Sequence, residues 1–299
     1  MKSQFKNKTA VITGAASGIG QALAFELAKL DCHLALCDID EKSLSLTRRK
    51  IKSLNPNLNV LSSAFDIRDS EAFASFRDLV KESFNGLNYL FNNAGFTIID
   101  SAVSDNINEM RKVMDVNYWG VVQGSILFLP LMKEDEQSHI VNMSSIYGIT
   151  SFPTQSAYCA SKHAIKAYTE CLAMENKGRK NLSVHCVHPG GVSTNILANA
   201  DVNDYSSTYD SKEDLTKAFE NIVWLNPQQA AKIILKGVAK NKFRIHVGIF
   251  AIGIDLLKRV FPNKYMSFFC NWIKLEAAVM KLRRKSFTKI STTSTEESF

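Results

Sequence analysis

The sequence predicts a single-domain α/β fold in which a doubly wound parallel sheet of about seven strands has helices on both faces. Short apolar runs typical of buried strands recur along the chain, and stretches of helical periodicity separate the first six of them. The chain has 299 residues, and α/β folds of about 250 residues commonly have one core. The predicted strands are residues 9–13, 33–37, 59–63, 88–92, 139–143, 183–188 and 243–248.

The first strand leads into a glycine-bearing turn and then an amphipathic helix, in the pattern Thr-Gly-x-x-x-Gly-x-Gly. Gly14 permits a tight turn, Gly18 lets the backbone approach a pyrophosphate, and Gly20 lets the helix pack closely on the strand. The phosphates would lie at the helix N-terminus, where free N–H groups and the helix dipole favour anions. This pattern indicates a Rossmann-type nucleotide site, and the alternative is a glycine-rich turn that binds no ligand.

The second predicted strand ends at Asp38, about 20 residues past the glycine turn. A carboxylate there can accept hydrogen bonds from both ribose hydroxyls, and it repels a 2′-phosphate. No Lys or Arg stands at Ser17 or Ile39, where a charge could hold that phosphate. The predicted cofactor is therefore NAD, with NADP the less favoured choice. Alternatively, Asp38 caps the next helix, a role that Asp40 could fill equally well.

Tyr158 and Lys162 are four residues apart on a predicted helix, so an ammonium lies beside a phenol. An unperturbed tyrosine has a pKa near ~10, and bringing it to neutral pH needs about 4 kcal/mol. One positive charge at ~4 Å with an effective dielectric of ~20 supplies about that free energy. The pair could therefore form a general base, although such a pair also occurs by chance on solvated helices.

Together these motifs resemble the short-chain dehydrogenase/reductase family, over about residues 5–250. The resemblance extends to Asp66-Ile67, to Asn92-Asn93-Ala94-Gly95 after the fourth strand, and to the helix residue Asn117. The family spacing of 13 residues before the tyrosine selects Ser145 as catalytic and leaves Ser144 structural. It implies that the cofactor is bound by Gly14, Ser17, Gly18, Ile19, Gly20, Asp38, Asp66, Ile67, Asn93, Ala94, Gly95, Tyr158, Lys162, Pro189, Gly190, Val192 and Thr194.

The same resemblance implies a reaction. Ser145 and Tyr158 contact the substrate: Ser145 donates a hydrogen bond to its oxygen, and Tyr158 takes the hydroxyl proton as hydride leaves for nicotinamide. Lys162 lowers the tyrosine pKa and holds the nicotinamide ribose, and Asn117 positions a water that carries the proton to solvent. Thr194 holds the carboxamide. Taken singly, Ser145 and Asn117 could equally be a loop hydroxyl and a turn-capping amide.

Composition favours a cytoplasmic protein. The six cysteines form no Cys-x-x-Cys and no cluster with histidine, so reduced thiols are expected and no metal site. Residues 1–8 are polar and do not look like a signal peptide. No apolar stretch reaches the ~18 residues that span a bilayer. In this interpretation His188, before Pro189, belongs to a strand end and is not catalytic.

The basic charge is concentrated at the C-terminal end. Residues 232–299 hold 14 Lys or Arg and 4 Asp or Glu, a net of 14 − 4 = +10, whereas residues 1–231 carry 22 − 25 = −3. Residues 265–285 can form a basic amphipathic helix with Phe268, Trp272, Leu275, Val279 and Leu282 on one side. We expect this helix to pack on the body or on a second subunit. The alternative is peripheral contact with a membrane.

Domain organisation follows from these features. We expect a catalytic NAD-binding domain over residues 1–250 with a substrate lid at about 195–226, a basic extension over 251–285, and a disordered tail over 286–299. The protein should form a homodimer or homotetramer. Nucleic-acid binding is not expected, because no reader motif accompanies the charge.

The substrate is predicted only by class. An apolar pocket would favour a bulky lipophilic alcohol or ketone, such as a steroid, a retinoid or a long-chain compound, although core packing also explains some of these side chains. Alternative functions are an NADPH-dependent carbonyl or acyl-chain reductase, a non-catalytic NAD-sensing or scaffold protein, and a membrane-recruited interaction protein. The pocket would be lined by Ile196, Leu197, Tyr205, Tyr209, Phe219 and Trp224, with Phe96 and Tyr147.

Overall fold

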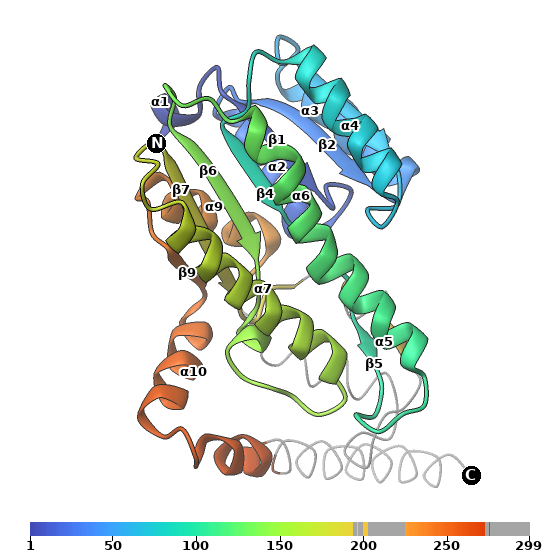
Figure 1. Cartoon of the computed structure of the whole chain (residues 1–299), viewed down its shortest axis with the longest axis vertical. Coiled ribbons are helices and arrows are strands. Elements are labelled where there is room, and N and C mark those ends of the chain that lie inside the picture. The colour runs from blue at the N-terminus through green and yellow to red at the C-terminus, as the bar shows by residue number, and fades with distance from the viewer. Residues whose placement is uncertain (194–195, 197–199, 203–224, 273–274, 276–299) are drawn as a thin grey trace, which may run out of the picture.

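A parallel seven-stranded sheet forms the centre of the molecule, with the strand order β3-β2-β1-β4-β6-β7-β9 (Figure 1). This computed structural model describes residues 1–193, 196, 200–202, 225–272 and 275. The fold prediction is confirmed, and each predicted strand lies within two residues of an observed one. The strands are β1 Thr9–Thr13, β2 His33–Asp38, β3 Val60–Ala64, β4 Tyr89–Asn92, β6 Ser138–Met143, β7 Leu182–Pro189 and β9 Arg244–Val247.

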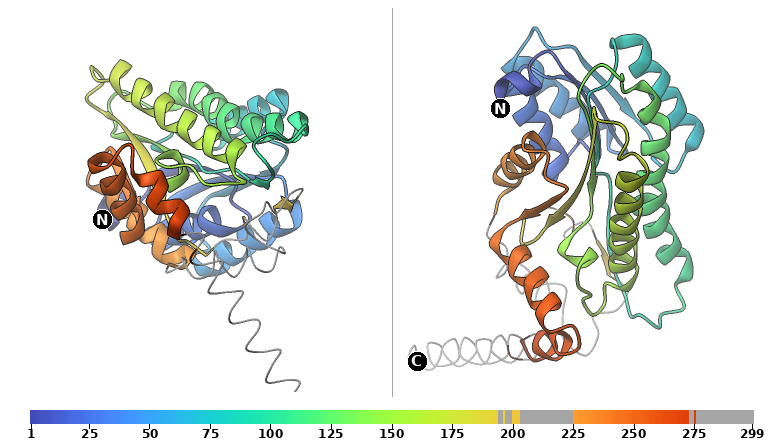
Figure 2. Two further views of the ribbon diagram at one scale, coloured as in Figure 1. Left: turned by 90° about the horizontal axis from the view of Figure 1, so that it is seen from below. Right: turned by 60° about the vertical axis from the view of Figure 1, so that its left-hand side comes forward.

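Helices cover both faces of this sheet, as Figure 2 shows. A short N-terminal helix, α1 (Lys2–Phe5), precedes the first strand. One face carries α2 (Gly18–Lys29), α3 (Glu41–Leu54) and α9 (Pro227–Ala239). The other face carries α4 (Ser70–Ser83), α6 (Gly120–Phe128) and α7 (Ser156–Glu175), with α5 (Ile107–Met114) packed against α7.

Polar side chains begin three of these helices. Asp40 accepts a hydrogen bond from the Ser43 N–H and caps α3. The Asp69 carboxylate does the same for α4, and Asn226 forms a reciprocal capping box that starts α9. Each such cap satisfies backbone donors that the first helical turn leaves unpaired, which stabilises the helix by about 1 kcal/mol.

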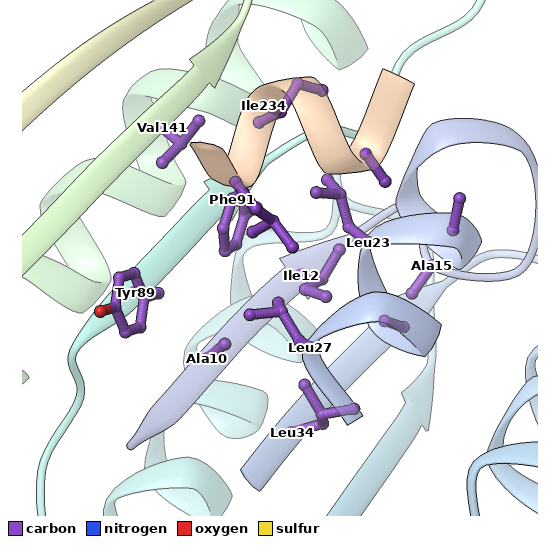
Figure 3. Packing of buried hydrophobic residues seen from close by; sticks show 14 of the residues in the cluster. Ala10, Ile12, Ala15, Leu23, Leu27, Leu34, Tyr89, Phe91, Val141 and Ile234 are labelled. Carbon is purple, nitrogen blue, oxygen red and sulfur yellow. The ribbon is translucent and has the colours of Figure 1, made fainter. Parts of the chain in front are cut away.

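Successive side chains of a strand point to opposite faces of the sheet, so the apolar core has two parts, one on each face. Ile12 points towards α2 and α9, where it joins a cluster with Leu23 and Ile234 (Figure 3). Val11, the preceding residue, points to the opposite face and joins Phe73 of α4. Because both faces of the sheet are buried, the strands are continuously apolar, which is why they were recognisable in the sequence.

The strand order reverses between β1 and β4, which is the place where doubly wound sheets bind ligands at their carboxyl ends. Two features near this edge were not predicted. Ile98–Ile99 (β5) pairs in parallel with Asp201–Val202 (β8). In addition, Asp115–Trp119 forms a π-helical turn between α5 and α6.

The C-terminal extension lies beyond the carboxyl end of the sheet (Figure 1). It consists of α10 (Ile249–Val260) and a further helical segment at 265–272. No helix in the described part of the chain is both long and apolar enough to cross a membrane. Most of the predicted lid and the whole predicted tail lie outside the described residues.

Candidate active site

The four residues predicted to be catalytic converge beyond β4 and β6. The Lys162 Nζ lies 5.4 Å from the centre of the Tyr158 ring, and Ser145 is within hydrogen-bonding reach of the Tyr158 hydroxyl. Asn117 approaches from the π-helical turn. A Cβ placed on Gly95 would lie 2.9 Å from the Asn117 Oδ1 and 3.4 Å from the Lys162 Nζ, so glycine alone fits between them.

Burial controls the protonation of the tyrosine. Only 9% of Tyr158 is exposed. Desolvation raises the pKa of its hydroxyl well above the ordinary value, and the hydrogen bond with Ser145 opposes this only in part. The expected lowering of the Tyr158 pKa by Lys162 stays a prediction, because burial is the largest cause of the shift here.

Lys162 is buried as well, and desolvation lowers its pKa to about 8. Its ammonium donates a hydrogen bond to the carbonyl of Met143, 2.9 Å away, at the end of β6. The backbone carbonyl of Lys162 in turn accepts a hydrogen bond of 2.8 Å from the Ser144 hydroxyl. Ser144 thus has the structural role expected of it, since it fixes α7 to the end of β6.

Asn117 is fully buried in the π-helical turn. Its Nδ2 donates to the Phe96 carbonyl and to the Ser161 hydroxyl, each at 3.0 Å, and its Oδ1 accepts from the Phe96 N–H. Both amide hydrogens are therefore used. Ser161, which sequence reasoning missed, also donates to the Tyr158 carbonyl at 2.8 Å and so joins Asn117 to the helix of the tyrosine.

Ser145 begins a short turn of 3₁₀-helix, and its hydroxyl accepts a hydrogen bond of 3.1 Å from the Tyr147 N–H. The carbonyl of Ser145 lies 3.1 Å from the Nδ1 of His188 on β7. A carbonyl can only accept, so Nδ1 carries the proton. The sequence did not reveal this contact, because one histidine before a proline gives no indication of its distant partner.

The glycine turn is wound tightly at the end of β1. Gly14 has a φ of +67°, and a Cβ on Gly20 would lie 2.0 Å from the Gly14 carbonyl. Asn93 donates its side-chain amide to the carbonyls of Thr13 and Gly14, at 2.9 and 3.1 Å. The Thr13 hydroxyl accepts from the N–H groups of Asn93 and Ala94. The segment after β4 thus holds the end of β1 and the glycine turn in place.

Helix α2 begins immediately after this turn. Ser17 is its N-cap residue, but no side-chain hydrogen bond caps the first turn. Ile19 is partly buried against the core. Asp38 accepts hydrogen bonds from the N–H groups of Ala16, at 2.8 Å, and Asp40, at 3.0 Å. A carboxylate offers about four acceptor positions, so Asp38 can take further donors. Asp40 caps α3, so the capping role considered for Asp38 belongs to Asp40.

The other residues predicted to bind the cofactor follow the ends of β3 and β7, and their surroundings differ. Asp66, after β3, is paired with Arg68 at 2.5 Å, which holds the pKa of its carboxyl below the usual value. Ile67 lies against Gly120. Gly190, after Pro189, packs so closely on Ile146 that a Cβ would lie 2.6 Å from the Cγ2 of that residue. Val192 is buried and bridges to Leu225, and Thr194 lies outside the described residues.

Aromatic rings form one side of the site. The Tyr147 ring stands edge-on to Tyr158, with the centroids 6.0 Å apart, and it also lies 5.7 Å from the Phe152 ring. Phe152 in turn meets Phe269 of the C-terminal extension at 5.9 Å. Of the predicted pocket residues, Tyr147, Phe96 and the half-buried Ile196 are described. Leu197, Tyr205, Tyr209, Phe219 and Trp224 lie outside the described residues.

In the described part of the chain, no three His, Cys, Asp or Glu side chains are grouped so that they could hold a metal ion.

Known proteins have similar sequences. A family model described as short chain dehydrogenase matches residues 8–204. SadH of Mycobacterium tuberculosis is 37% identical over 265 residues, covering 88% of this chain and 94% of that protein. Dehydrogenase/reductase SDR family member 7B of Bos taurus is 32% identical over 246 residues, covering 81% of this chain and 74% of that protein.

A solved structure agrees. A short-chain dehydrogenase/reductase from Burkholderia phymatum, in complex with NAD, matches with a TM-score of 0.77 and 27% identity, covering 86% of this chain and 95% of that chain. At the level of class, the protein is an oxidoreductase. More narrowly, the chain belongs to the short-chain dehydrogenase/reductase family, and the resemblance predicted from its motifs is confirmed.

Proposed function

We propose that the protein transfers hydride between a secondary alcohol or ketone and the nicotinamide of NAD, with Tyr158 as the acid and base. The observation that carries this proposal is the convergence of Asn117, Ser145, Tyr158 and Lys162 at the carboxyl edge of the sheet. A non-catalytic NAD-sensing protein on this fold would tolerate loss of the phenol or the ammonium, and here both stand buried and in place.

The residues present fit a nicotinamide dinucleotide. The glycine turn holds its backbone close to Ala94, since a Cβ on Gly14 would lie 2.8 Å from the Ala94 Cα, and the turn admits no side chain there. The uncapped N–H groups at the start of α2 can bind a pyrophosphate. A bound nicotinamide supplies the hydride acceptor or donor. That the Burkholderia phymatum relative was solved with NAD supports the same cofactor here.

Each catalytic side chain then has a role. Ser145 donates its hydroxyl to the substrate oxygen, and Tyr158 exchanges a proton with that oxygen. The raised pKa of Tyr158 suits the reductive direction, in which a neutral phenol is the proton donor. Lys162 holds the nicotinamide ribose. Since both amide hydrogens of Asn117 are engaged, a relay water would be held through its remaining oxygen lone pairs.

Asp38 sets the cofactor preference in this proposal. Its unused acceptor positions can bind ribose hydroxyls, whereas a 2′-phosphate would meet a carboxylate. The substrate would be bulky and lipophilic, because the wall of Tyr147 and Phe152 beside Tyr158 is aromatic.

The test is a turnover screen that follows absorbance of the reduced nicotinamide. Steroid alcohols, retinol and long-chain secondary alcohols, with their ketones, are offered with NAD and with NADP. We expect turnover of at least one lipophilic pair and a higher kcat/KM with NAD. A preference for NADP would overturn the cofactor assignment, and turnover of small polar alcohols alone would overturn the substrate class.

Matched variants sharpen the cofactor test. Asp38→Ala should narrow the ratio of kcat/KM for NAD over NADP by about tenfold, the effect of one strong hydrogen bond or charge repulsion. Asp40→Ala removes an equal charge two residues away and serves as the control. It should leave the ratio unchanged while costing about 1 kcal/mol of stability through the lost helix cap.

A further inference from the structure

Large apolar side chains are exposed along the C-terminal extension. In α10, Ile249, Ile252, Leu256 and Val260 follow at spacings of three and four residues, which puts them on one side of the helix. They are 80%, 54%, 60% and 57% exposed. Met266 and Phe268, on the next helical segment, are 56% and 52% exposed. We call the four exposed residues of α10 the C-terminal apolar face.

The opposite side of α10 is fixed to the body of the protein. Ala251 and Ile254 are buried against Ile146 and Ile149, next to Ser145. The Lys258 ammonium donates to the Ile149 carbonyl. Three residues before Lys258, Asp255 is 3.0 Å from the Nε2 of His246 on β9. The C-terminal apolar face is therefore presented outward by a helix that is held in place.

Of the predicted amphipathic helix over 265–285, the structure describes residues 265–272 and 275. Phe269 and Trp272 pack inward, with their rings 5.7 Å apart, and Trp272 also lies 6.4 Å from Phe250. Phe268 and Leu275, which were placed on one side with Trp272, are 52% and 64% exposed. The segment thus contacts the body through one side and leaves large apolar side chains on another.

The sequence of this segment is rich in basic residues. Between residues 256 and 285 the sequence has eight Lys or Arg, at 258, 259, 264, 274, 281 and 283–285, and one acidic residue, Glu276. A symmetric contact with a second copy would place the same patch against itself, and so would bring these like charges together. Exposed aliphatic side chains also do not suit a nucleic acid as the partner. A surface that is both apolar and anionic fits better.

We propose that the C-terminal apolar face docks the protein onto an anionic lipid bilayer. Ile252 and Leu256 would enter the boundary of the acyl chains, and lysines and arginines of the basic segment would meet the headgroups. Docking would bring the bilayer within a short chain of aromatic rings, from Phe269 through Phe152 to the wall beside Tyr158. If the proposed function holds, this is a route for a lipophilic substrate.

The experiment measures binding and needs no activity. The full chain is sedimented with vesicles of phosphatidylcholine containing 30% phosphatidylglycerol, and with pure phosphatidylcholine, in 50 mM and 500 mM NaCl. We expect at least tenfold stronger binding to the anionic vesicles in low salt and a marked weakening in high salt. The double variant Ile252→Ser with Leu256→Ser should bind at least tenfold more weakly.

A matched control uses two leucines of similar exposure elsewhere. Leu54 and Leu79, on α3 and α4, are 56% and 43% exposed, and Leu54→Ser with Leu79→Ser should bind vesicles like the unchanged chain. Both double variants should melt at the same temperature as each other. Equal binding by the two would overturn the proposal, as would a lack of binding to any vesicle. A change of oligomer size caused by the Ile252 and Leu256 variant, without vesicle binding, would assign the face to a second copy instead.

Discussion

At the amino end of the sheet, the His139 ring lies between Tyr89 and His185, with centroids 4.9 and 5.3 Å away. At the carboxyl end, Tyr158 lies beside Lys162, and His188 lies 3.1 Å from the Ser145 carbonyl. Both ends bury a tyrosine whose pKa burial raises, and both bury histidines whose pKa burial lowers.

The two ends differ in what those groups bond to. His185 Nδ1 must donate to the Lys242 carbonyl, 2.7 Å away, so its Nε2 accepts from the Nδ1 of His139 at 3.0 Å. The Tyr89 hydroxyl donates to the carbonyl of Gln4. At the carboxyl end, His188 Nε2 is buried and has no partner among the described residues. Burial and shifted pKa values are thus common to both ends, and they do not by themselves identify the site.

The largest expected effect tests whether the two tyrosines differ in function. Tyr158→Phe keeps the ring and removes the proton donor, so kcat should fall by about 10²–10⁴-fold, the usual size of general acid and base catalysis. NAD binding, measured by calorimetry, should remain within about threefold. Normal turnover by this variant would show that the tyrosine assignment is wrong.

The next prediction concerns pH and the amino end. Burial lowers the pKa of His139 to about 3, from about 6.5 in the unfolded chain. Between these values the unfolded state binds more protons, so this contribution to stability is fully present above about pH 6.5 and is lost as pH falls towards 3. From pH 6.5 to 5 the loss is about 2 kcal/mol. Urea unfolding of the unchanged chain and of His139→Phe should give a shallower pH slope for the variant, and equal slopes would contradict the prediction.

The third prediction asks whether His188 positions Ser145. His188→Phe fills the space but cannot donate to the Ser145 carbonyl, so kcat should fall about tenfold, the equivalent of one hydrogen bond of about 1.4 kcal/mol. His188→Asn places an amide N–H near the position of Nδ1 and should restore most of kcat. A merely structural role would lower the melting temperature of both variants without this difference in kcat.

The smallest effect is expected at the amino end. Tyr89→Phe loses one buried hydrogen bond to Gln4 and should cost about 1 kcal/mol of unfolding free energy. Its kcat should not change. A loss of kcat comparable to that of Tyr158→Phe would abolish the distinction between the two ends of the sheet.

The sequence was sufficient for the sheet because parallel strands are buried on both faces and appear as apolar runs separated by helices. The residues at the carboxyl edge could also be predicted, since the glycine turn and the Tyr-x-x-x-Lys pair are local patterns. The sequence could not give contacts between distant segments, such as the approach of His188 to Ser145. It could not give the degree of burial of Tyr158 either, because desolvation depends on all the elements that pack around the ring.

The π-helical turn at Asn117 has a consequence for how this region is compared between proteins. Such a turn contains one residue more than an α-helix of the same length. Because each residue advances an α-helix by about 100°, the faces of α5 and α6 are out of phase, and a single helical wheel drawn through residues 107–128 would misplace half of them. Relatives that lack the extra residue should align with a one-residue gap here. Deleting Tyr118 should straighten the helix and turn Asn117 away from Phe96 and Ser161.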